Sequence, residues 1–252
     1  MLLEVKDLNI SLTSEKSVAE HISFRLGQGE MLSIVGSSGA GKTTICKAIM
    51  GLLGNTYRAD GEILFQGEDL LDLPERKRQT IYGKEICLIM QNPMTAFNPS
   101  IRVGRQMEKT YLLHHGKTPR QEMQRLFAAI LQKLGLEDTQ RILNSYPFTL
   151  SGGMLQRLMI AAALMCQPAL LVADEATTAI DACNRIGLMR ELKSFCKDGM
   201  SVLFVTHDLR SASVSDRILV MDRGQIVEQG KTEQILNTPK ELSLIHISEP
   251  TR

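Results

Sequence analysis

The segment that most constrains this sequence has the pattern G-x-x-x-x-G-K-[ST] and reads Gly36-Ser37-Ser38-Gly39-Ala40-Gly41-Lys42-Thr43. A short apolar run, Met31–Val35, precedes it, and a helical pattern, Thr44–Leu52, follows it. In this context the loop N–H groups point at phosphate oxygens, and the helix N-terminus adds partial positive charge. Lys42 is expected to reach the outer phosphates and the Thr43 hydroxyl to bind Mg²⁺. The sequence therefore predicts binding of a nucleoside triphosphate.

Composition narrows the class of protein. The chain has 252 residues, which suffices for one large domain or two small ones. Its formal net charge of +1 predicts no general attraction to nucleic acid or to anionic lipid. The longest apolar stretch, Leu158–Cys166, has nine residues, whereas a membrane-spanning helix needs about 20. We therefore expect no nucleic-acid partner, no bilayer crossing and, from the acidic start MLLEVKDLN, no signal peptide.

The cysteines and histidines do not form a metal-binding pattern. The five cysteines are scattered without a C-x-x-C pair, so we expect reduced thiols rather than a disulfide or metal site. His114-His115 is the one histidine pair, and without a third ligand nearby it is expected to be a solvated loop pair.

Four short apolar runs are typical of parallel strands that are covered on both faces, and they are Met31–Val35, Ile86–Met90, Ala169–Ala173 and Val202–Val205. A chemically capable residue closely follows each run: Gly36, Gln91, Asp174-Glu175 and His207, in that order. Ligands of open α/β sheets bind beyond the carboxyl ends of the strands. We therefore expect one site at which all four strand ends meet.

The residues at these strand ends suggest separate roles. Asp174 matches the acidic residue that completes a P-loop Mg²⁺ site, acting through a bound water. Glu175 is the candidate for moving a proton. Two adjacent carboxylates after a buried strand are costly unless one faces a metal and the other accepts a proton. His207 could donate to the terminal phosphate and hold the attacking water. Gln91 could bind Mg²⁺ or water.

The flanking segments predict further elements. Alternating patterns in residues 2–26 predict antiparallel strands, and residues 61–67 predict another strand. Residues from about 92 to 165 become helical, with Pro119 able to start a helix that buries an apolar stripe of Met123, Leu126, Phe127, Ile130, Leu131 and Leu134. Residues 217–227 predict a hairpin with a glycine turn.

A second phosphate-binding helix start is predicted after Leu150. Ser151 can cap the helix that follows, while Gly152 and Gly153 let a phosphate approach its exposed N–H groups. One triphosphate could use both helix starts if two subunits enclose it between them.

With this second motif beside the first, the chain resembles the ATP-binding cassette (ABC) ATPases over residues 2–240. By this resemblance Gly36–Thr43 is Walker A, Gln91 the Q-loop, Leu150–Met154 the signature and Leu170–Asp174 Walker B, with Glu175 the general base, Asp181 in the D-loop and His207 the switch histidine. The resemblance implies an α/β P-loop NTPase fold, with a RecA-like parallel core, an antiparallel β subdomain and a helical subdomain at about 92–165. It also implies one ABC ATPase domain over residues 1–240.

Finer features are similar to the peptide/nickel importer branch. The features shared with this branch are Met90-Gln91-Asn92-Pro93 and Ala96-Phe97-Asn98-Pro99. Two further segments resemble nickel-import ATP-binding subunits most, and they are Tyr146-Pro147-Phe148 and Gly153-Met154-Leu155-Gln156-Arg157. This implies an ATP- and Mg²⁺-dependent ATPase that energises uptake of nickel or a related metal chelate. Oligopeptide or dipeptide import is the alternative, and a non-transport ABC ATPase is a third reading.

The same resemblance implies partners and a location. The expected partners are two transmembrane permease subunits, a second and non-identical ABC ATPase subunit, and an extracytoplasmic solute-binding protein. The subunit would lie peripherally on the cytoplasmic face of a bacterial plasma membrane. The sequence departs from the family at Leu12, near the place where an aromatic residue usually stacks on adenine, and in residues 241–252, an atypical tail that we interpret as non-native.

Overall fold

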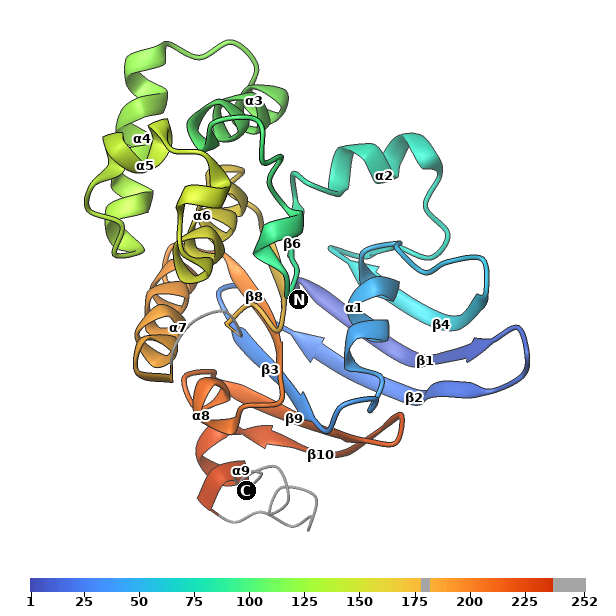
Figure 1. Cartoon of the computed structure of the whole chain (residues 1–252). Coiled ribbons are helices and arrows are strands. Elements are labelled where there is room, and N and C mark those ends of the chain that lie inside the picture. Colours follow the sequence, from blue (N-terminus) through green and yellow to red (C-terminus); the bar gives the residue numbers. More distant parts are fainter. Residues whose placement is uncertain (178–181, 238–252) are drawn as a thin grey trace.

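The computed structural model describes residues 1–177 and 182–237, and two β-sheets organise them (Figure 1). The first sheet is antiparallel and has the strand order β2-β1-β4-β5. Its strands are β1 (Leu3–Leu12), β2 (Ser17–Leu26), β4 (Tyr57–Phe65) and β5 (Glu68–Asp69). The antiparallel N-terminal strands are therefore confirmed, and the strand predicted at 61–67 begins earlier, at Tyr57.

The second sheet has the order β10-β9-β3-β8-β7-β6. Its strands are β3 (Met31–Gly36), β6 (Ile86–Ile89), β7 (Leu170–Asp174), β8 (Ser201–Thr206), β9 (Arg217–Asp222) and β10 (Gln225–Lys231). The neighbouring strands from β9 to β6 are parallel, and β10 forms an antiparallel hairpin with β9. All four predicted parallel strands are confirmed, and they lie side by side.

Both faces of this sheet are covered, which explains why its strands are continuously apolar. On β8, Leu203 and Val205 belong to a core shared with β1, β2 and α1 (Lys42–Ile49). The alternate residues, Val202 and Phe204, belong to a second core shared with the helices on the opposite face. Because successive side chains of a strand point to opposite faces, neither set can be polar.

Helices α6 (Gly152–Met165) and α7 (Ala182–Cys196) pack on that opposite face, and three further helices pack on α6 and on one another (Figure 1). The three are α3 (Val103–His115), α4 (Arg120–Lys133) and α5 (Thr139–Asn144). Pro119 caps α4 as predicted, and the apolar stripe is buried except for Leu126, which is partly buried. The helical region is interrupted by loops and by two 3-10 turns, Pro93–Thr95 and Pro147–Thr149. Its standing as a separate subdomain stays a prediction.

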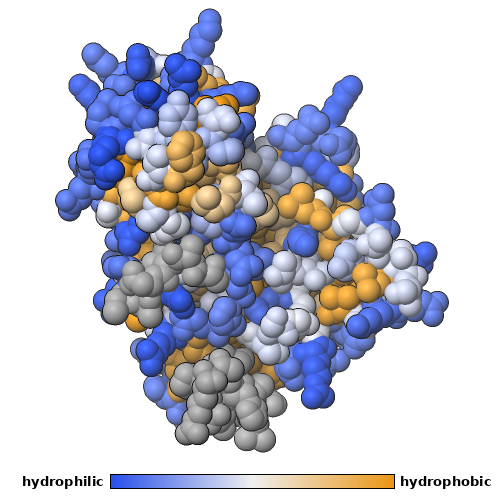
Figure 2. Space-filling view, in the orientation of Figure 1, coloured by the Kyte–Doolittle hydropathy of each residue, from blue (hydrophilic) through white to orange (hydrophobic). Residues whose placement is uncertain are grey.

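Three shorter helices complete the described chain: α2 (Glu75–Ile81), α8 (Leu209–Ala212) and α9 (Thr232–Asn237). The sequence analysis missed α2, which has no buried residue and therefore shows no apolar periodicity. No helix in the described ranges has the length and apolar character that crossing a bilayer requires. Hydrophilic residues cover much of the face seen in Figure 2, and the hydrophobic ones form smaller patches.

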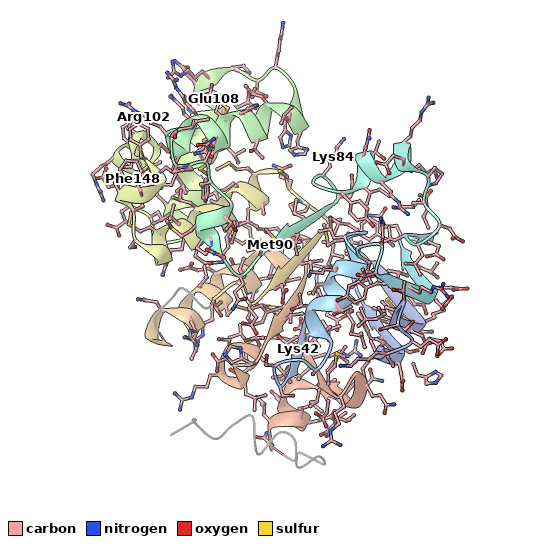
Figure 3. All side chains as sticks on the ribbon, turned by 45° about the vertical axis from the view of Figure 1, so that its right-hand side comes forward. Lys42, Lys84, Met90, Arg102, Glu108 and Phe148 are labelled. Atoms are coloured by element: carbon pink, nitrogen blue, oxygen red, sulfur yellow. The ribbon has the colours of Figure 1, made fainter. Side chains whose placement is uncertain are left out.

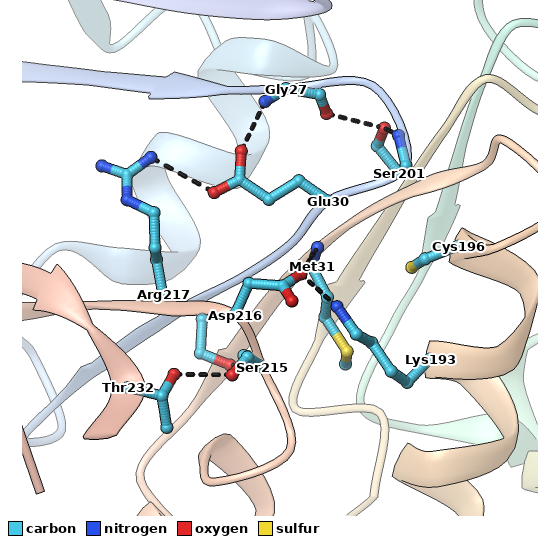
Figure 4. Close-up of polar contacts among 12 residues, drawn as sticks. Gly27, Glu30, Met31, Lys193, Cys196, Ser201, Ser215, Asp216, Arg217 and Thr232 are labelled. Carbon is cyan, nitrogen blue, oxygen red and sulfur yellow. Dashed lines mark hydrogen bonds and ion pairs between the residues drawn. The ribbon is translucent and has the colours of Figure 1, made fainter.

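Polar contacts join the sheet strands at the end where β3, β8 and β9 begin (Figure 4). The Glu30 carboxylate accepts from the Gly27 N–H (2.6 Å) and pairs with Arg217 (3.3 Å). Asp216 accepts from the Met31 N–H (2.8 Å) and pairs with Lys193 of α7. These contacts fix the strands at one end, and the candidate functional residues lie at the other.

Candidate nucleotide-binding and hydrolysis site

The predicted phosphate loop connects the end of β3 to the start of α1. Gly41 has φ 95°, in the left-handed region, and precedes the first helical residue, Lys42. A Cβ on Gly36 would lie 2.3 Å from the Met221 carbonyl oxygen, so a side chain cannot fit there. The turn thus depends on its glycines, and its outer residues, Ser37, Ser38 and Gly39, are exposed to solvent, whereas Ala40 is buried.

Lys42 turns back into this loop. Its Nζ donates to the carbonyl oxygens of Gly36 and Ser37, both at 2.8 Å, and the residue is only 5% exposed. Burial lowers the pKa of Lys42, and the charges of Glu175 and Asp174 oppose this shift. The ammonium group is therefore held at the place where the phosphates of a nucleotide are expected (Figure 3).

Thr43 meets the end of β7. Its hydroxyl donates to Asp174 Oδ1 at 3.2 Å. Burial raises the pKa of Asp174, whereas the Thr43 hydrogen bond and the charge of Lys42 lower it. A hydroxyl and a carboxylate in contact are hard oxygen donors that suit Mg²⁺, which usually takes one or two carboxylates together with substrate phosphates. In the described part of the chain, no three His, Cys, Asp or Glu residues are grouped for a metal.

Glu175 connects the ends of three strands. Its Oε2 accepts from Gln91 Nε2 at 3.1 Å, and its Oε1 lies 3.0 Å from His207 Nδ1. The Glu175 N–H donates to the Val205 carbonyl of β8 at 2.9 Å, and φ of 49° turns the chain sharply after β7. The structure therefore gathers Lys42, Thr43, Asp174, Glu175, Gln91 and His207 through these contacts at the carboxyl ends of the parallel strands. That Gln91 and His207 share one carboxylate was not predicted.

The second predicted phosphate site lies at the start of α6. Ser151 caps this helix by accepting from the Met154 N–H at 3.3 Å. Ser151 and Gly152 are exposed and Gly153 is partly exposed. No hydrogen bond within residues 1–177 and 182–237 connects this turn to the Lys42–Glu175 cluster. Asp181 and the tail at 241–252 lie outside the described residues.

Comparison with known proteins decides the family. The family model described as "ABC transporter" matches residues 19–178, more than half of the chain. The chain belongs to the ABC transporter family. Its matched region contains the phosphate loop, the Ser151 cap and both carboxylates of the site.

Two curated relatives of this ABC ATPase are ATP-binding proteins of transport systems. The ATP-binding protein CntD of the metal-staphylopine import system in Staphylococcus aureus is 40% identical over 95% of this chain and 89% of its own length. The oligopeptide transport ATP-binding protein OppD of Bacillus subtilis is 41% identical over 95% of this chain and 68% of its own. The two relatives, at nearly equal identity to this chain, are named for different cargoes.

Solved structures confirm the ABC ATPase fold. The dimeric structure of a bacterial ABC transporter cassette is 27% identical, with a TM-score of 0.81, over 92% of this chain and 99% of that one. A dimeric post-hydrolysis state bound to ADP and Pi has a TM-score of 0.80 at the same identity and coverage. The α/β architecture predicted from the sequence is therefore correct.

One polar residue of this cassette was not singled out as a candidate. Gln156 of α6 is fully buried, and neither its carboxamide nitrogen nor its oxygen has a hydrogen-bond partner among residues 1–177 and 182–237. Gln156 lies one helical turn after Gly152, directly behind the exposed start of α6. Sequence reasoning could have noticed a glutamine beside Arg157 within the mostly apolar α6.

Proposed function

We propose that this ABC ATPase energises an importer by binding and hydrolysing ATP, and that its cargo is nickel or a related metal chelate. The observation that carries the proposal is the hydrogen-bonded cluster at the strand ends, in which Glu175 contacts both Gln91 and His207. Such a cluster pairs phosphate-binding groups with a carboxylate suited to accept a proton from water.

The phosphate side of the site would bind the nucleotide. Lys42 and the N–H groups of Gly36–Thr43 neutralise the phosphate oxygens, and the start of α1 adds its dipole. Thr43, Asp174 and Gln91 would hold Mg²⁺, which supplies positive charge to the phosphates when it is bound. With Lys42 already inside the loop, little reorganisation is needed before the charge develops.

The opposite side of the site would activate water. Glu175 accepts the proton of the attacking water, and its two side-chain contacts keep both carboxylate oxygens oriented. His207 supports the water and the terminal phosphate. Because three strands position these groups, the geometry is set before nucleotide arrives.

A second cassette would complete each site. The exposed Ser151 and partly exposed Gly153 of the facing subunit would supply a capped helix start to the γ-phosphate, and we assign Asp181 a role at the same junction. Support comes from the solved relatives, which are described as dimeric cassettes. We propose that the second ATPase is a non-identical paralogue and that the pair binds two permease subunits at the cytoplasmic face of a bacterial membrane. A solute-binding protein outside would deliver the cargo.

The cargo is the finest part of this proposal. Similarity to a metal-staphylopine import protein supports a metal chelate, while equal similarity to an oligopeptide transport protein keeps peptide import as the alternative. Metal-chelate import and peptide import assign the same ATP chemistry to this subunit, because cargo contacts lie in the permease and the binding protein.

Uptake by a deletion strain tests the proposal. We expect loss of radiolabelled nickel uptake with normal uptake of a labelled oligopeptide, and recovery of nickel uptake with the native gene but not with Glu175→Gln. Loss of oligopeptide uptake alone would show that the cargo is a peptide and not nickel. Normal uptake of both, with the protein purifying away from any permease, would contradict the transport role.

A further inference from the structure

A cavity away from the nucleotide site brings two cysteines together. It has a volume of about 280 Å³ and lies between β6, α3 and α6. Cys87 of β6 and Cys166, which caps the C-terminus of α6, both line it, as do Met107 and Met159. Ala96 also lines the cavity and is exposed to solvent, so a small molecule can enter.

The two thiols are buried but differ in character. Each residue is 6% exposed, and their Sγ atoms lie 3.5 Å from the Gly83 carbonyl and 3.6 Å from the Ala162 carbonyl, respectively. The two side chains act on each other, which raises the pKa of Cys87 and lowers that of Cys166, and burial raises the pKa of Cys87 further. The Cys87 thiol donates to the Gly83 carbonyl. In reactive dithiols one sulfur attacks as the thiolate and the other resolves the product.

We propose that Cys87 and Cys166 form an oxidisable dithiol, at which a small hydroperoxide closes a reversible disulfide between β6 and α6. The Cys166 thiolate attacks the terminal oxygen of the peroxide, the O–O bond breaks, and the sulfur becomes a sulfenic acid while an alkoxide leaves, or hydroxide in the case of hydrogen peroxide. The Cys87 sulfur then displaces the sulfenic oxygen, which departs as water with the Cys87 proton. Two thiols are oxidised and one peroxide is reduced.

The position of this dithiol gives the oxidation a consequence. β6 leads directly to Gln91, and α6 begins with the Ser151 cap at its other end. A covalent link between the two elements would fix the Q-loop strand against the helix that is offered to a second cassette. This consequence rests on the proposed function, whereas the chemistry at the two sulfurs does not.

The test treats the purified full-length chain with hydrogen peroxide under native conditions and then determines its intact mass. We expect a monomer lighter by about 2 Da, with two fewer titratable thiols and a Cys87–Cys166 peptide in the digest. Dithiothreitol should restore the original mass. In the assembled transporter, the same treatment should suppress ATP turnover reversibly.

Variants make the result specific. Cys87→Ala should stop at a sulfenic acid on Cys166 that dimedone traps, and Cys166→Ala should prevent the disulfide. Cys196→Ala serves as the matched control, because burial raises the pKa of this α7 thiol to about 11 and it does not line the cavity. Thermal melting checks that each variant is folded.

Failure of the proposal is distinguishable from failure of the proposed function. No mass change, only addition of oxygen atoms, or a disulfide between other cysteines would overturn the dithiol assignment whatever the ATPase does. Disulfide formation with unchanged turnover would retain the modification site and overturn its regulatory consequence.

Discussion

Two regions of this ABC ATPase differ in how far their polar side chains are paired within the chain. They are the carboxyl ends of β3, β7 and β8, and the start of α6. At the strand ends Lys42, Thr43 and Glu175 all have partners within the chain. At the start of α6, Ser151 is exposed, and Gln156 behind it is buried without a partner. Under the proposed function, the first region is prepared for chemistry before any ligand binds, and the second is prepared to meet another cassette.

Glu175→Gln, in the cluster at the strand ends, should have the largest effect. We expect ATP turnover of the assembled transporter to fall by about 10²–10⁴, because an amide cannot accept the proton of the attacking water. ATP binding should persist, since Lys42 and the loop are unchanged. Phosphate release and nucleotide binding are measured side by side, with the exposed Glu122→Gln as control. Unaltered hydrolysis would refute the role of Glu175.

Lys42→Ala should act on binding itself. Hydrogen bonds to charged groups contribute about 1.5–3 kcal/mol, so ATP affinity should fall roughly 10- to 100-fold. Equilibrium binding of a fluorescent ATP analogue measures the effect. The exposed Lys47→Ala, on the same helix, is the control and should change affinity little. Equal losses in both variants would indicate general charge rather than the loop geometry.

Gln156→Met should stabilise the free protein. Replacing two unpartnered buried polar atoms with an apolar chain of similar length removes a desolvation cost of about 1–3 kcal/mol. Urea denaturation in the absence of nucleotide should show this gain, while Leu158→Met, at another fully buried position of α6, should show none. A loss of stability in Gln156→Met would mean that the carboxamide already has a favourable environment.

Ser151→Ala should separate the two regions. Loss of the helix cap costs about 0.5–2 kcal/mol of stability, and ATP-driven pairing of cassettes should weaken. ATP affinity of the single chain should not change, because this cap contacts none of the Lys42 cluster. Sedimentation with and without ATP measures pairing, and Ser151→Thr should retain it. Reduced ATP affinity of the monomeric Ser151→Ala variant would show that the start of α6 also contributes to nucleotide binding within one chain.

Asp174→Asn tests how much the buried negative charge of Asp174, at the end of β7, lowers the stability of the folded chain. Because burial raises the folded-state pKa of Asp174, the folded chain binds this proton more tightly than the unfolded chain. The cost of its charge is present above that pKa and is relieved as the pH falls through it. The variant should therefore melt slightly higher at neutral pH, with this advantage fading in acid. The exposed Asp198→Asn is the control, and a lower melting temperature for Asp174→Asn would contradict the assignment.

The sequence predicted what depends on local pattern. The four apolar runs, the phosphate loop and the Ser151 cap were recognisable because periodicity and glycine spacing are written along the chain. The convergence of Gln91 and His207 on one carboxylate was not, since it depends on strand order and on the turn at Glu175. Helix α2 was missed because it has no buried face. Gln156 was missed because the adjacent polar pair Gln156-Arg157 in a mostly apolar helix carries no period that shows which of the two is buried.

The backbone hydrogen bond from Glu175 to Val205 has a mechanical consequence. It couples the candidate base to the strand that carries His207, so a sliding or tilting of the sheet displaces both groups together and preserves their spacing. Under the proposed function, motion transmitted from a permease would then change the distance between this pair and an approaching group while the contact within the pair is kept. In such an arrangement, the motion decides when the reaction occurs, and the spacing of Glu175 and His207 stays the same.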